Sequence, residues 1–154
     1  VQQSHLKLYN MQHYQDLTPE DRAKLLLFPA YLTLLASNSN GGLEESEKKQ
    51  AQRFAHIKTF TSHPLLRDFY DEVDSHFKTD LERLDAELPK DKDQREQIIR
   101  KRLIEIEMVL GKLNEEYSLI MHKSMRSFKE HISKAHHNVL ESFVFPVPIK
   151  GLTP

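Results

Sequence analysis

The sequence contains no cysteine and no tryptophan, and only four of its 154 residues are glycine. The absence of cysteine excludes disulfides, thiolate metal sites and a cysteine nucleophile, and it fits a reducing compartment, so we expect a cytoplasmic protein. So few glycines and no tryptophan leave little material for a β-rich fold, and the composition favours helices. A chain of this length fits one domain with a single core.

Neither a large net charge nor a long apolar run is present. The 22 basic and 23 acidic residues give a formal net charge of −1, so we expect no nucleic-acid partner and no attraction to a membrane surface. The longest apolar stretch, residues 25–36, falls short of the roughly 18 residues that cross a bilayer, which predicts a core helix and no membrane span. The first residue is valine with no apolar leader behind it, so we expect a start trimmed from a longer chain.

Motifs of known enzymes are also absent. The sequence has no Gly-x-Ser-x-Gly turn, no phosphate-binding Gly-x-x-x-x-Gly-Lys loop and no dinucleotide-binding glycine pattern. Two charged clusters are expected on solvated helix faces and not in a catalytic set. They are the acidic group Asp68, Asp71, Glu72 and Asp74, and the basic group Arg95, Arg100, Lys101 and Arg102, which is interleaved with Glu96, Glu105 and Glu107.

One short pattern occurs twice, 70 residues apart, in residues 41–47 and 111–117. Each copy follows an apolar stretch typical of a helix and precedes another, which predicts two helix-turn-helix corners. Each corner offers a glycine, which can adopt a positive φ, and acidic residues at the start of the next helix, where the helix dipole favours negative charge. We therefore expect the two corners, at Gly41 and Gly111, to be equivalent.

The spacing of apolar residues predicts an all-α, single-domain bundle of five to six helices in residues 18–137. Thr18 and Pro19 open a helix that runs to about Ser37, and Pro29 bends it or divides it in two. A second helix is expected over about 43–59, with Ala51, Phe54, Ala55 and Ile57 buried. Three longer helices are expected to bury the stripes Leu66, Phe69, Val73, Phe77, Leu81, Leu84 and Leu88; Ile99, Leu103, Ile106 and Leu110; and Tyr117, Met121, Met125, Phe128, Ile132 and Ala135.

Caps and flanking segments complete this organisation. Asp91 or Asp93 is expected to cap the fourth helix, and Asn114 the last one. Residues 1–17 form an N-terminal extension with one weak amphipathic helix. Residues 138–154 are expected as an extended tail, because Pro146 and Pro148 prevent a helix, and its apolar side chains favour packing on the bundle or on a neighbour.

Residues 34–47, Leu-Leu-Ala-Ser-Asn-Ser-Asn-Gly-Gly-Leu-Glu-Glu-Ser-Glu, resemble the signature of the TerB-like family, in which an apolar helix ends in Ala-x-x-Asp-Gly-x-Ile-x-x-x-Glu. The resemblance is clear over about 15 residues and extends by helix layout over about 110, from Leu17 to His136. It implies an all-helical fold of two pseudo-symmetric halves, with the corner at Gly111 as the partner of the first. The family is named for tellurite resistance, so the resemblance also implies a stress- or tellurite-resistance-related role.

The first corner also offers oxygen ligands for a divalent cation: Asn38, Asn40, Glu44 and Glu47. Hard cations such as calcium prefer carboxylate and amide oxygens, although the order of an EF-hand loop is missing here. The alternative is that Asn40 and Gly41 form the turn and that the glutamates stabilise the start of the helix.

Nine histidines raise the question of a transition-metal site, but neither Glu-x-x-His nor His-x-x-x-His occurs. The pairs Glu72–His76 and His137–Glu141 are expected as surface contacts. The cluster of His131, His136 and His137 is expected to cap a helix end. No cofactor is predicted.

Three hypotheses for function remain open. The first is a non-enzymatic interaction domain that binds a protein partner or associates with itself, for example as a homodimer. The second is a bundle that binds a divalent cation at residues 38–47, or a small ligand between its helices. The third is an enzyme of unrecognised type.

Overall fold

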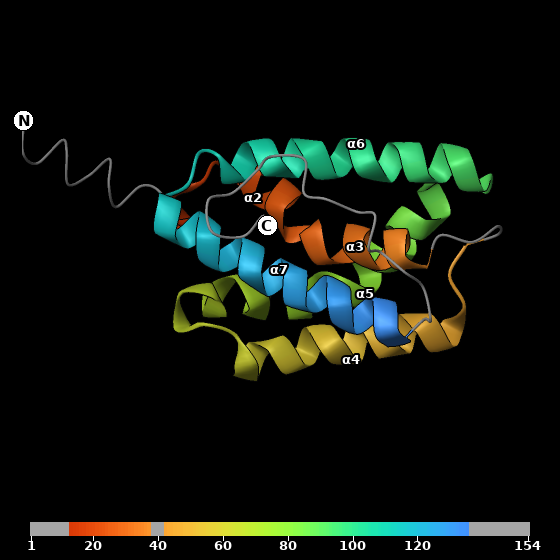
Figure 1. The fold of residues 1–154 in the computed structure, drawn as a ribbon, viewed down its shortest axis with the longest axis horizontal. Coiled ribbons are helices and arrows are strands. Elements are labelled where there is room, and N and C mark those ends of the chain that lie inside the picture. Colours follow the sequence, from red (N-terminus) through yellow and green to blue (C-terminus); the bar gives the residue numbers. More distant parts are fainter. Residues whose placement is uncertain (1–12, 38–41, 136–154) are drawn as a thin grey trace, which may run out of the picture.

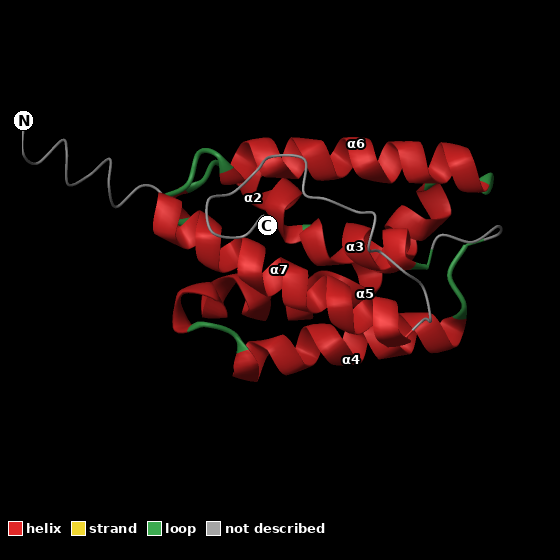
Figure 2. Ribbon diagram, in the orientation of Figure 1, coloured by secondary structure: helices red, strands yellow, loops and turns green. Residues whose placement is uncertain are grey.

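The computed structural model of this protein describes residues 13–37 and 42–135, which fold as a single all-α domain without strands (Figure 2). The elements are η1 (Tyr14–Asp16), α2 (Pro19–Leu26), α3 (Phe28–Ala36), α4 (Glu45–Thr61), η2 (Pro64–Leu66), α5 (Arg67–Glu87), α6 (Lys92–Leu110) and α7 (Glu115–Ala135). The prediction of an all-α bundle is confirmed. The expected tail over 138–154 and the weak helix in the first twelve residues lie outside the described ranges.

The α3 helix lies at the centre of the bundle. All nine of its residues are buried, and it packs against α5, α6 and α7. Figure 1 shows α6 along one side of the molecule and α4 along the other, with α3 and α7 between them. The outer helix α4 packs on α5 and α7. A helix that is apolar on every side must be enclosed, and this arrangement encloses it.

A break at Leu27 separates α2 from α3. Thr18 Oγ1 accepts a hydrogen bond from the Asp21 amide at 3.2 Å, and Pro19 occupies the first turn of α2, as expected from the sequence. Pro29 lies in the first turn of α3, where its missing N–H leaves no intrahelical hydrogen bond unmade. Of the two outcomes expected for Pro29, a bend or a restart, the structure has the restart.

The predicted apolar stripes form the core. Every expected residue of α5 and α6 is buried, and so are five of the six expected on α7; the side chain of Ala135 is not described. The rings of Phe77 and Phe128 meet edge to face across α5 and α7, with centroids 6.4 Å apart. The prediction for α4 is only partly right: Ala51 and Ala55 are buried, but Phe54 is half-buried and Ile57 is 43% exposed.

The two corners share their caps but differ in their glycines. Glu44 and Asn114, which occupy equivalent positions in the repeat, are the N-cap residues of α4 and α7. Asp91 caps α6, through a hydrogen bond from the Gln94 amide. Gly42 has a φ of 103°, whereas Gly111 has a φ of −64°, which any residue adopts. Gly41, the counterpart of Gly111 in the repeat, lies outside the described residues, so the equivalence of the two glycine turns stays a prediction.

Candidate functional site

The glycine corner before α4 was predicted to hold a cation through Asn38, Asn40, Glu44 and Glu47. Asn38 and Asn40 lie outside the described residues. The two glutamates form a capping box, in which the Glu44 side chain accepts from the Glu47 amide and Glu47 Oε1 accepts from the Glu44 amide at 2.8 Å. Both carboxylates thus have partners at the start of α4, as in the alternative interpretation.

Asp85 of α5 holds this corner against the rest of the bundle. Its carboxylate accepts hydrogen bonds from the Leu43 amide at 3.3 and 3.4 Å, and it also pairs with the Arg95 guanidinium. Arg95 is 1% exposed and its guanidinium also donates to the Asp85 carbonyl. A Cβ on Gly42 would lie 3.0 Å from Asp85 Oδ1, so the corner requires glycine both for its positive φ and for space.

A second buried ion pair joins α6 to α7. Glu107 Oε2 lies 2.6 Å from His122 Nε2, and the two residues are 2% and 0% exposed. His122 Nδ1 lies 2.7 Å from the Ser118 carbonyl, which can only accept, so Nδ1 carries a proton. One further proton must then lie between Nε2 and Oε2, on either the imidazole or the carboxyl group.

This pair resembles a catalytic dyad in composition but not in access. Both side chains are sealed from solvent, and Glu107 Oε1 has no hydrogen-bond partner within the described residues. A substrate could reach neither group without displacing a helix. The pair thus links α6 to α7 inside the protein.

Three tyrosines are buried at the end of the bundle where η1 lies. The hydroxyl of Tyr14 donates to Glu72, and the hydroxyl of Tyr70 bonds to Ser124. Burial raises the pKa of Tyr14, Tyr70 and Tyr117 above the ordinary tyrosine value of 10.0, and at Tyr14 the hydrogen bond to Glu72 raises it further. These hydroxyls stay protonated at neutral pH, and those of Tyr14 and Tyr70 form hydrogen bonds that join η1 to α5 and α5 to α7.

Other sequence predictions about charged and histidine residues have mixed outcomes. The acidic cluster lies at the surface of α5, as expected, and Asp74 pairs with His56 at 3.0 Å. Within residues 13–37 and 42–135, no three histidine, aspartate or glutamate side chains come together as a metal site. His131 Nδ1 contacts the Ser127 carbonyl; His136 and the pair His137–Glu141 lie outside the described residues.

Arg95 and Glu107 were predicted to lie on a solvated helix face, and that prediction is wrong. Arg100 pairs with Glu96, and Arg102 with Glu105, at the surface as expected, but Arg95 and Glu107 are buried. A signal was present, since Arg95 precedes Ile99 by four residues and Glu107 follows Leu103 by four, so both continue the apolar stripe of α6. His122 lies among the apolar positions of α7 in the same way, between Met121 and Met125.

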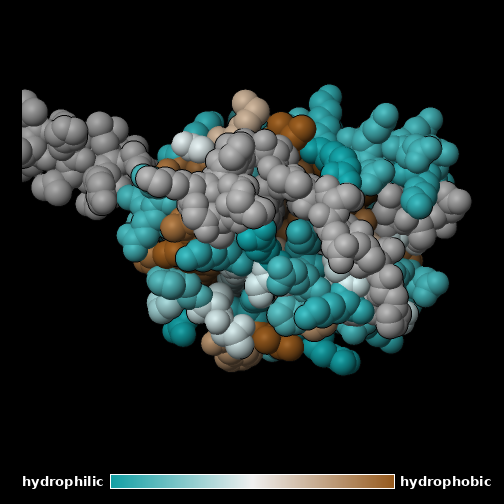
Figure 3. Space-filling view, in the orientation of Figure 1, coloured by the Kyte–Doolittle hydropathy of each residue, from teal (hydrophilic) through white to brown (hydrophobic). Residues whose placement is uncertain are grey.

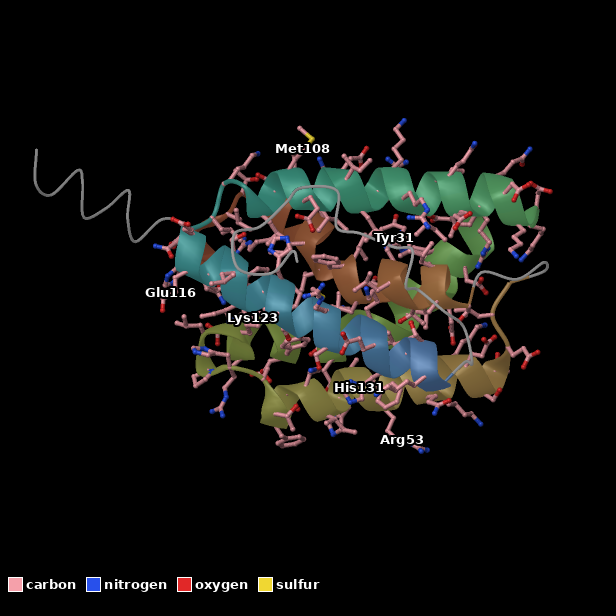
Figure 4. The ribbon with its side chains drawn as sticks, in the orientation of Figure 1. Tyr31, Arg53, Met108, Glu116, Lys123 and His131 are labelled. Carbon is pink, nitrogen blue, oxygen red and sulfur yellow. The ribbon has the colours of Figure 1, made fainter. Side chains whose placement is uncertain are left out.

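The surface carries two pairs of exposed apolar side chains on opposite sides of the bundle. On α4, Ile57 and Phe60 are 43% and 75% exposed; on α6, Ile104 and Met108 are 46% and 66% exposed. The members of each pair are three or four residues apart and therefore adjacent on one helix face. Figure 3 shows apolar colour at the edge over α4 and at the edge over α6, and Met108 is labelled on α6 in Figure 4.

No protein-family model, curated protein or solved structure matches this chain. Within the described ranges, none of the helices combines the length and the apolar character that a bilayer crossing needs. Function is therefore inferred from the interior and the surface of the molecule themselves.

Proposed function

We propose that this protein is a non-enzymatic helical interaction domain that binds a protein partner or a second copy of itself. The observation that carries the proposal is the contrast between interior and surface. The buried polar groups pair with one another beyond the reach of solvent, as in Glu107–His122, while large apolar side chains stand exposed on well-packed helices. Adjacent exposed apolar residues on a rigid helix are typical of a docking surface.

A TerB-like arrangement of two halves is part of the same proposal. Its support is the matching position of the N-cap residues Glu44 and Asn114, each followed by glutamate and a helix of similar role. The leucines before the caps also correspond, since Leu113 is buried and Leu43 packs against the core. A stress- or tellurite-resistance-related role rests on the sequence resemblance alone.

The proposal is tested by placing a photoreactive amino acid at exposed positions and irradiating cells that produce the protein. We expect a discrete cross-linked species from position 57 or position 104, because these side chains lie beside Phe60 and Met108. The matched control is Lys78 on the exposed face of α5. The cross-link from position 57 should disappear when Phe60→Ser is added, and the cross-link from position 104 when Met108→Ser is added.

Mass spectrometry of the product distinguishes a partner protein from a second copy. Cross-linking that is equal at positions 57, 104 and 78, or absent from all three, would contradict an interaction through these surfaces.

A further inference from the structure

Positive charge is concentrated on the side of the bundle formed by α4 and α7. Residues 49–61 contain three basic residues and no acid, and residues 119–134 contain four basic residues and one glutamate, in a chain whose formal net charge is −1. Six of these basic residues and two apolar ones define what we name the α4–α7 surface: Lys49, Arg53, Ile57, Lys58, Phe60, Lys123, Arg126 and Lys134.

The two helices are antiparallel neighbours. Lys58 Nζ donates to Ser127 Oγ at 3.1 Å, and the ring of Phe54 lies 5.7 Å from the ring of His131. A step of four residues toward the start of α4, from Lys58 to Phe54, therefore corresponds to a step of four residues toward the end of α7, from Ser127 to His131. This register places Lys123 near the end of α4 that carries Phe60, and Figure 4 shows Arg53 and His131 together farther along the same side.

Three of the positive charges on this surface are available for a partner. Within the described residues, Lys49, Arg53 and Lys123 are exposed and form no ion pair. Burial lowers the pKa of Lys58, and burial lowers the pKa of Lys129, which the charge of nearby Arg126 lowers further. A concentration of one sign of charge attracts opposite charge and speeds association.

An apolar anchor lies among these charges. Phe60 is the most exposed of the large apolar side chains described, and Ile57 is adjacent to it on α4. The ring of His56 contacts Phe60 edge to face, with centroids 5.4 Å apart, and thereby orients it. A ring of this size supplies much of the apolar area that an interface can bury.

We infer that the α4–α7 surface binds an acidic amphipathic helix of a partner protein. The apolar side chains of the partner helix cover Ile57 and Phe60, and the carboxylates of that helix lie against Arg53 and Lys123. A third helix laid along two antiparallel ones is a common mode of peptide recognition. The inference rests on the proposed function and adds the chemistry of the partner.

Other occupants fit this surface less well. A second copy using the same surface would bring Lys49 and Arg53 of both copies together, and like charges repel. The α5 helix of a second copy offers eight acids against three basic residues, but its large apolar side chains are all buried, so Phe60 would stay uncovered.

Nucleic acid would match the charge but not the rest of the surface. Single-stranded nucleic acid stacks its bases on several aromatic side chains, whereas Phe60 is the one largely exposed aromatic residue in the described part of the chain. An anionic lipid surface is distinguished from the acidic helix by the vesicle measurement described below.

The test uses two helical peptides of about five turns with the same leucine face, one with glutamate and the other with lysine at the remaining positions. Fluorescence anisotropy of the labelled peptides measures their affinity for the full chain. We expect binding of the acidic peptide, loss of binding as salt rises, and no binding of the basic peptide. The variant Arg53→Glu with Lys123→Glu should bind the acidic peptide at least about tenfold more weakly, and so should Phe60→Ser.

Matched controls carry equal changes elsewhere on the surface. Lys78→Glu with Lys101→Glu makes the same change in net charge on α5 and α6, and Met108→Ser removes an exposed apolar side chain from α6. These variants should bind within about twofold of the original chain. Circular dichroism and thermal melting confirm that every variant is folded.

Three results would overturn the inference: equal affinity for the acidic and basic peptides, no weakening in the variants of the α4–α7 surface, or tighter binding of oligodeoxythymidine or of phosphatidylserine vesicles. If one of these occurs while cross-linking from position 57 still depends on Phe60, the proposed function stands and only the acidic partner is wrong. If position-specific cross-linking fails as well, the proposed function falls with it.

Discussion

Gly42 is the residue on which the first corner depends. Its φ of 103° lies in a region that other residues rarely adopt, and the Asp85 carboxylate fills the space beside it. We predict that Gly42→Ala lowers the free energy of unfolding by about 1 to 3 kcal/mol, measured by urea denaturation.

The second glycine supplies the control. Gly111 already has a φ of −64°, and the nearest atom to an added Cβ, the Met108 carbonyl oxygen, lies 3.4 Å away. Gly111→Ala should change stability by less than about 1 kcal/mol. Equal effects of the two substitutions would contradict the importance of the positive φ and of the Asp85 carboxylate at Gly42.

The buried pair Glu107–His122 permits a second test at the scale of single residues. His122→Leu alone leaves the Glu107 carboxyl group buried without its partner, and we expect a loss of about 3 to 5 kcal/mol. The double variant with Glu107→Leu should lose less than the sum of the two single variants, by about 1 to 3 kcal/mol, because an apolar pair needs no hydrogen bonds. Urea denaturation of all four proteins gives this coupling, and additive losses would contradict it.

At the scale of elements, the spacing of apolar residues was sufficient to predict the long helices. The stripe from Leu66 to Leu88 places every member in the core because a period of 3.6 residues leaves only one face for burial. The caps Thr18 and Asn114 were predictable for a similar reason, since a short polar side chain before an apolar run satisfies the first amides.

The wrong predictions of burial concern residues whose surroundings depend on contacts between helices. Arg95 was placed outside because its charge suggested solvent, yet Asp85, ten residues earlier on another helix, supplies the partner that makes its burial tolerable. Ile57 was placed inside because of its apolar side chain, but it is 43% exposed. The spacing places Arg95 on the apolar stripe of α6, but the sequence alone does not identify its partner, because the partner depends on how the helices pack.

The prediction about cation binding concerns the start of α4. Glu44 and Glu47 are occupied in a capping box, so we expect calcium, magnesium, zinc and iron salts to leave the melting temperature unchanged. A ligand that binds only the folded state would raise that temperature in proportion to its concentration and affinity. A saturable rise that is lost in Glu47→Gln would show instead that residues 38–47 bind a cation.

At the scale of the whole molecule, the buried tyrosines determine the response to alkali. Their pKa values in the folded state lie above the ordinary value of 10.0, so the stability that they contribute is complete below pH 10 and is lost as pH rises above it. Each tyrosine that stays protonated only in the folded state lowers the free energy of unfolding by about 1.4 kcal/mol per pH unit above 10. Lys58 acts in the opposite direction, because its pKa is lowered, but it is only partly buried.

We therefore predict that tyrosinate absorbance rises together with the loss of helical circular dichroism in a titration above pH 10. The variant Tyr70→Phe should show a shallower dependence on pH, by the contribution of one tyrosine. Ionisation of the buried tyrosines near pH 10 in a protein that remains folded would contradict the burial of these side chains.

The central position of α3 has a consequence for synthesis of the chain. Residues 28–36 are made before α5, α6 and α7, which surround them and follow by about 30 to 100 residues. On the ribosome this apolar segment stays exposed to water, or bound by a chaperone, until α7 emerges. A nascent chain stopped before Glu115 would expose α3, and premature termination there would yield an aggregating product instead of a smaller folded domain.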